Sequence, residues 1–121
     1  MNLAKAVARG IEQQGNQVDT FDGVRDPNVK LTIYQYVVIG TEPTGTFGGK
    51  IPDAIKPFLA TSGNVAGRKS YAFVTKATFG AAKSLAALMK TMEGEGMVLK
   101  TSDILRSPAE AEEIGKRLHI N

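Results

Sequence analysis

The run TGTFGGK at residues 44–50 is the segment of this sequence that comes nearest to a nucleotide-binding loop. A P-loop has a glycine at its first position and a Ser or Thr directly after its lysine, because backbone N–H groups cradle the phosphates and the hydroxyl binds Mg²⁺. Here Thr44 occupies the glycine position, and Ile51 follows Lys50. These two departures exclude a P-loop.

The other side chains that could do chemistry form no catalytic set. His119 is the single histidine and stands two residues from the end of the sequence, so neither a catalytic triad nor a multi-histidine metal site is expected. Asp22, Asp26 and Asp103 lack the spacing of metal ligands. Cysteine is absent, which excludes disulfides, zinc ribbons, thiolate-held iron–sulfur clusters and thiol nucleophiles. Redox chemistry would therefore require an organic cofactor.

Size and composition predict one soluble globular domain over residues 1–121. The net charge of +3 arises from fifteen Lys and Arg residues scattered among twelve acids, so no nucleic-acid surface is expected. No apolar run approaches the length of a membrane span, and the first residues form an amphipathic pattern that does not match a signal peptide. We therefore expect a cytoplasmic protein without a membrane partner.

Hydrophobic periodicity predicts helices and strands in alternation along the chain. Strands are expected at residues 18–21, 36–39, 69–75 and 97–100, and helices at residues 3–14, 52–59, 81–92 and 108–118. Pro57 should kink or shorten its helix, whereas Pro108 suits the first turn of the last one, with Ser107 as its N-cap.

This alternation is typical of an α/β protein with a parallel sheet and right-handed crossovers. The continuous apolar run at residues 36–39 indicates a strand buried on both faces of that sheet. Ligands of such sheets bind beyond the carboxyl ends of the strands. The loops at residues 41–50 and 75–79 are therefore the expected location of a site.

Two long stretches resemble the flavodoxin family. They are YQYVVIGTEPTGTFGGKIPDAIKPFL at residues 34–59 and GRKSYAFVTKATFGAAKSLAALMKTMEGEGMVL at residues 67–99. The first is similar to the third strand, a flavin loop and the next helix, and the second to the fourth strand through the fifth. The resemblance implies a flavodoxin-like, three-layer, doubly wound parallel sheet, with about four strands and four helices here.

In that family the FMN ring lies between the loops after the third and fourth strands, which match residues 41–50 and 75–80 here. Phe47 would stack on the ring, and glycines would bring backbone N–H groups close to it. The residues expected to contact the flavin are Thr41, Thr44, Gly45, Thr46, Phe47, Gly48, Thr75, Lys76, Ala77 and Phe79.

Simpler interpretations of these residues stay open. Glycine-rich loops commonly form turns and nothing else, and an aromatic residue at the start of a helix, such as Phe79, is more often a core or staple residue. Lys50 and Lys76 could pair with a negatively charged flavin or phosphate, but exposed lysines are usually only solvated.

The sequence departs from the family at its start, because Met1 and Asn2 already lie in the first helix. The first strand and the phosphate-binding loop of flavodoxins are missing, so FMN binding should be weakened or lost. We expect the strand either upstream of Met1 in the source DNA or from a partner. Without it, the strand at residues 36–39 exposes an apolar edge, which predicts self-association.

Two functions follow from the resemblance and its limits. The first is a flavodoxin-like FMN-binding protein of electron transport, an electron carrier with a redox partner protein and not a hydrolase or transferase. The alternative is a non-catalytic flavodoxin-like module that binds no flavin and serves in assembly or regulation. A stoichiometric flavin spectrum of the purified protein separates the two.

Overall fold

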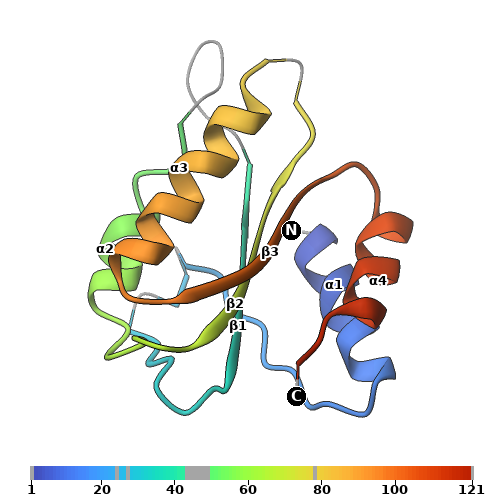
Figure 1. Ribbon diagram of the computed structural model, residues 1–121, viewed down its shortest axis with the longest axis horizontal. Coiled ribbons are helices and arrows are strands. Elements are labelled where there is room, and N and C mark those ends of the chain that lie inside the picture. The colour runs from blue at the N-terminus through green and yellow to red at the C-terminus, as the bar shows by residue number, and fades with distance from the viewer. Residues whose placement is uncertain (1, 24, 27, 43–49, 78, 121) are drawn as a thin grey trace. The chain divides into compact units, whose positions relative to one another are not determined.

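The computed structural model describes residues 2–23, 25–26, 28–42, 50–77 and 79–120 (Figure 1). In chain order the elements are α1 (Asn2–Gln13), β1 (Tyr36–Thr41), α2 (Ile55–Ala60), β2 (Lys69–Thr75), α3 (Ala81–Gly94), β3 (Val98–Leu105) and α4 (Pro108–Arg117). The three strands are parallel and form one sheet in the order β1-β2-β3. The predicted α/β class with a parallel sheet is confirmed.

The chain divides into two compact units. One unit joins residues 1–20 to residues 105–121 and contains α1 and α4. The other unit, residues 21–104, contains the sheet with α2 and α3. Most residue contacts fall within one unit or the other. The candidate site lies in the sheet unit, residues 21–104.

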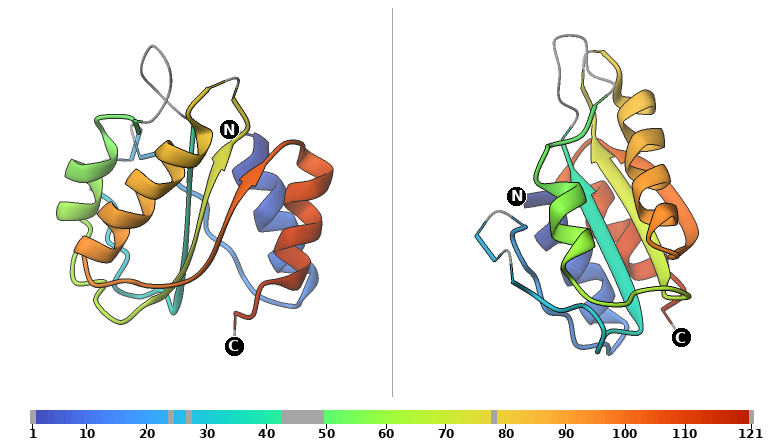
Figure 2. Two further views of the ribbon diagram at one scale, coloured as in Figure 1. Left: turned by 45° about the horizontal axis from the view of Figure 1, so that its top comes forward. Right: turned by 90° about the vertical axis from the view of Figure 1, so that its left-hand side faces the viewer.

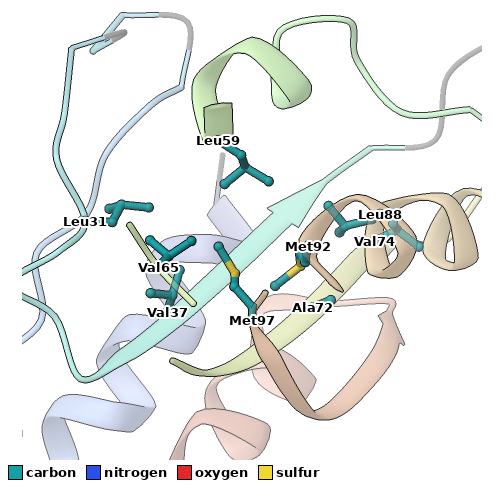
Figure 3. Packing of buried hydrophobic residues seen from close by; sticks show 9 residues of the cluster. All are labelled: Leu31, Val37, Leu59, Val65, Ala72, Val74, Leu88, Met92 and Met97. Atoms are coloured by element: carbon teal, nitrogen blue, oxygen red, sulfur yellow. The ribbon is translucent and has the colours of Figure 1, made fainter. Parts of the chain in front are cut away.

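In the sheet unit, α2 and α3 lie on the same side of the sheet (Figure 2). Figure 3 shows the apolar cluster between these helices and the strands, which consists of Leu31, Val37, Leu59, Val65, Ala72, Val74, Leu88, Met92 and Met97. The strands contribute alternate residues, because successive side chains of a strand point to opposite faces. The opposite face of β2 carries Tyr71 and Phe73, which are fully buried and stacked with ring centroids 6.0 Å apart.

β2 is the central strand of the described sheet, and its residues 70–74 are all buried. Its pairing with β3 is supported by the hydroxyl of Tyr71, which donates to Asp103 Oδ2 at 3.0 Å. β1 lies at the end of the strand order, and four of its six residues are only partly buried. The prediction that residues 36–39 are buried on both faces is therefore wrong, because the side chains of an end strand are flanked by those of one neighbouring strand only.

Partial burial also affects the single tyrosine of β1. It raises the pKa of Tyr36 above the ordinary value of 10.0, since a charged phenolate is disfavoured where water is excluded. The strand therefore carries no charge at neutral pH.

The predicted strand at residues 18–21 is wrong, because the structure describes these residues and assigns them no strand. A strand exists only where a neighbour completes its hydrogen-bond ladder, and in the flavodoxin order 2-1-3-4-5 this segment would pair with the first strand, not with β1. The sheet accordingly has three described strands, where the sequence predicted four.

Two element boundaries also differ from prediction. α2 begins at Ile55, three residues after Pro52, and Pro57 lies in its first turn, where a missing N–H costs no helical hydrogen bond. β3 runs on to Leu105, beyond the predicted end at Lys100. Residues 101–103 are polar and gave no strand signal in the sequence, although an end strand accepts polar side chains.

The helix unit packs α1 against α4 at a pair of glycines. A Cβ placed on Gly10 would collide with the backbone oxygen of Glu112 and lie 2.8 Å from the Cα of Gly115. Glu112 also accepts hydrogen bonds from Gln13 at 3.0 Å and from Arg9 at 3.2 Å. These bonds, that of Gln13 first, lower the pKa of the Glu112 carboxyl below 4.5.

The start of α4 follows the prediction from its sequence. Ser107 is the N-cap and its hydroxyl accepts the backbone N–H of Glu110 at 3.2 Å, while Pro108 is the first helical residue. The carboxylate of Glu110 in turn accepts the N–H of Arg106 at 3.0 Å. Among the described residues, no helix has both the length and the apolar character needed to cross a membrane.

Candidate functional site

The candidate site lies at the carboxyl edge of β1 and β2. The two strands are parallel, and their register places Thr41, the last residue of β1, beside Val74 of β2. Neighbouring strands lie about 4.8 Å apart, so the chain leaves both strands at the same edge. The loops that the sequence assigns to a ligand therefore begin side by side (Figure 1).

The first loop is described only at its two ends. Thr41 is 6% exposed, and its hydroxyl lies 3.5 Å from the carbonyl oxygen of Glu42. Lys50 is exposed at the other end. The remaining predicted flavin contacts of this loop, Thr44, Gly45, Thr46, Phe47 and Gly48, lie outside the described residues.

The second loop follows β2 directly. Thr75 and Ala77 are half-buried, whereas Lys76 is exposed. Phe79 is 62% exposed, which places it outside the core and overturns the interpretation of this residue as a core residue at a helix start.

Gly80 sets the junction between this loop and α3. Its φ of 75° lies in the left-handed region, which side chains with a Cβ rarely adopt. The backbone turns sharply there, so that the loop ends next to Phe79 and the helix begins at Ala81.

Ser84 is a positioning residue that sequence reasoning missed. It is fully buried on α3, and its hydroxyl donates to the backbone oxygen of Lys50 at 2.7 Å. The bond ties the end of the first loop to the helix that follows the second. A signal was present, because Ser84 interrupts the apolar stripe of α3 four residues before Leu88.

Gly40 allows close packing beneath the carboxyl edge of β1, where the candidate site begins. An added Cβ would overlap the ring of Phe73, which is fully buried on the neighbouring strand. The glycine thus lets the aromatic ring pack directly on the β1 backbone, one residue before Thr41. Within the described ranges, His, Asp and Glu form no group of three that could hold a metal ion.

The chain was compared with family models, curated proteins and solved structures. No family model matches the sequence, and no curated protein matches it. Among solved structures, the two-electron reduced flavodoxin of Megasphaera elsdenii is similar with a TM-score of 0.78 and 16% identity, over 95% of this chain and 86% of that chain.

Two further flavodoxins are similar over most of their length. A flavodoxin from the domain Archaea has a TM-score of 0.72 and 19% identity, over 98% of this chain and 84% of its own. The oxidised flavodoxin 1 of Bacillus cereus has a TM-score of 0.72 and 18% identity, over 93% and 84% of the two chains. Likeness at this low identity establishes the fold. The chain has a flavodoxin-like α/β fold.

Proposed function

We propose that this protein is a flavodoxin-like electron carrier that holds the ring of FMN at the carboxyl edge of β1 and β2. The observation that carries the proposal is the β1–β2 register, which brings the starts of both loops together at Thr41 and Val74 in a flavodoxin-like fold. In open α/β sheets, ligands bind in the crevice outside this edge.

The described residues at the edge suit a flavin ring. Phe79 is 62% exposed, and its ring would stack on the flavin and exclude water. Lys76 and Ala77 follow the last residue of β2, and their backbone amides would approach a polar edge of the ring. When bound, the flavin supplies the electron-accepting and electron-donating group, and the chain positions it.

The residues proposed for the first loop complete the other wall. Thr44, Gly45, Thr46 and Gly48 would supply backbone contacts, and Phe47 the second aromatic face. The hydrogen bond from Ser84 to Lys50 fixes where this loop returns to the sheet unit. Thr41 and Thr75 mark the points where the two walls begin.

We propose that these residues alone hold FMN more weakly than a flavodoxin does. Flavodoxins also bind the phosphate through charge-assisted hydrogen bonds of roughly 1.5–3 kcal/mol each. The edge instead presents the exposed cations Lys50 and Lys76, which attract an anion without a fixed geometry. An electron carrier of this kind also needs a partner protein with a redox centre, which would approach the exposed edge.

Phe79→Ala tests the proposed wall after β2. We expect the parent chain to quench FMN fluorescence on titration, and Phe79→Ala to weaken the apparent affinity by about threefold, because aromatic contacts contribute about 0.5–1.5 kcal/mol. Phe47→Ala should weaken it further, since Phe47 lies in the middle of its loop.

Phe21→Ala is the matched control. Phe21 is 40% exposed and packs edge-on against Tyr34, which precedes the amino end of β1, away from the proposed site. This variant should bind FMN with the affinity of the parent. Absence of quenching by the parent at high micromolar protein would remove the site and favour a module without flavin, and equal losses in Phe21→Ala and Phe79→Ala would remove Phe79 from it.

A further inference from the structure

Three exposed lysines stand at the carboxyl edge of the sheet unit, and we call them the basic edge: Lys50, Lys76 and Lys83. Lys76 follows the last residue of β2, and Lys83 lies in the first turn of α3, which begins near that end of the strand (Figure 1). Lys50 belongs to the same place, because its backbone oxygen accepts the hydroxyl of Ser84, the next residue of α3, at 2.7 Å. Cations from both loops and from α3 therefore lie at one edge.

The charges of α3 run against its helix dipole. A helix favours acids in its first turn and cations in its last, because its N-terminus carries a partial positive charge. α4 follows this rule, with Glu110 in its first turn and Lys116 and Arg117 in its last. α3 instead has Lys83 in its first turn, no basic residue in its last turn, and Glu93 directly before its final residue. Helix stability therefore does not explain these charges, which add to the positive potential at the edge.

The basic edge is not neutralised by neighbouring acids. In the part of the chain that the structure describes, none of its three lysines forms an ion pair. Residues 40–60 and 75–85 contain two acids, Glu42 and Asp53, against four cations. Near the amino ends of the strands, by contrast, Lys30 and Arg68 donate hydrogen bonds to backbone carbonyl oxygens. The carboxyl edge thus keeps a surplus of positive charge that the fold itself does not use.

We propose that the basic edge docks an acidic surface of the redox partner protein. The inference deepens the proposed electron transfer and rests on it for the redox centre of that partner. Opposite charges steer two proteins together and raise their association rate, whereas a partner with a basic surface would be repelled. A nucleic acid fits less well, because its affinity comes from many phosphate contacts and the basic edge supplies three cations.

Charge reversal in the flavin-free protein tests this docking surface. The probe is a short, fluorescently labelled poly-glutamate peptide, whose anisotropy reports binding in about 0.1 M salt. We expect the parent to bind the peptide and to lose affinity as salt is raised. Lys83→Glu should weaken binding about fivefold, because it removes one attraction and adds one repulsion. The change also places an acid in the first turn of α3 and should stabilise the helix, so misfolding would not explain the loss.

Lys69→Glu is the matched control. Lys69 is exposed like Lys83, and its reversal changes the net charge by the same amount. It is the first residue of β2, so the length of the strand separates it from Lys76 by about 20 Å. This distance exceeds the screening length of about 10 Å in 0.1 M salt. The control should bind the peptide within about twofold of the parent.

Two results would overturn the basic edge as a docking surface. One is a parent that does not bind the peptide, and the other is an equal loss for Lys69→Glu and Lys83→Glu. A short oligothymidine strand that displaces the peptide and binds more tightly would overturn an acidic protein as the occupant.

FMN titration of the same variants separates docking from flavin binding. An FMN affinity that falls in Lys83→Glu as much as the peptide affinity would assign Lys83 to the flavin phosphate and overturn the docking role. Failure of the parent to bind FMN, with its peptide binding intact, would instead contradict the electron carrier while supporting the acidic docking surface.

Discussion

Gly10→Ala is expected to lower the free energy of unfolding by about 3 kcal/mol, at the upper end of overpacking effects. The added Cβ would collide with the backbone oxygen of Glu112 and lie 2.7 Å from the backbone nitrogen of Lys116. All of these neighbours are backbone atoms of α4, so the contact is relieved only if the two helices separate. Denaturant unfolding, followed by circular dichroism, measures the loss.

Gly94→Ala is the control for this substitution. Gly94 is the last residue of α3, and an added Cβ there meets nothing within 4 Å. The same change should therefore stabilise the protein by up to about 0.5–1 kcal/mol, because alanine is the better helix former. If Gly10→Ala is as harmless as Gly94→Ala, α1 and α4 do not cross at their glycines.

Gly40→Ala is expected to cost about 1–3 kcal/mol of stability, because the new methyl group would overlap the ring of Phe73 in a fully buried position. Phe73→Leu in the same chain should recover part of that loss by removing the ring. A double-mutant cycle of unfolding free energies measures the coupling between the two sites, which we expect to exceed about 0.5 kcal/mol.

Phe73→Leu alone provides the reference for this cycle, since it creates space on an unchanged β1 backbone. Additive losses in the double variant would mean that Phe73 does not pack on Gly40. In that case the Phe73 ring does not support the β1 backbone at Gly40, next to Thr41.

Local signals allowed part of the fold to be predicted closely. The apolar run KSYAFVT predicted a strand over residues 69–75, and β2 spans Lys69–Thr75. Ser107 and Pro108 likewise marked the start of α4. These elements could be predicted because the residues that define them are neighbours in the sequence.

Features that depend on distant residues could not be predicted in this way. Residues 18–21 have the composition of a strand, but composition cannot supply the neighbouring strand that a ladder needs. Gly10 reads locally as a weak helix residue, yet it lies against Gly115, more than a hundred residues away. Its role follows only from the packing of two helices.

The candidate site was likewise predicted in part from local sequence, while its other features depend on distant residues. The order of strands and helices predicted which loops share an edge, and the register of β1 and β2 places their starts together. The exposure of Phe79 and the hydrogen bond from Ser84 to Lys50 depend on how α3 packs, which periodicity does not specify. The contacts of Phe47 remain a prediction.

The most direct measurement of the central claim is an FMN titration of isotope-labelled protein, followed by the chemical shifts of its backbone amides. The flavin ring is proposed to lie between the loops after β1 and β2. We therefore predict concentration-dependent shifts at residues 41–50 and 75–80, with little change in α4. Unchanged spectra at all FMN concentrations, or shifts confined to α4, would contradict the account.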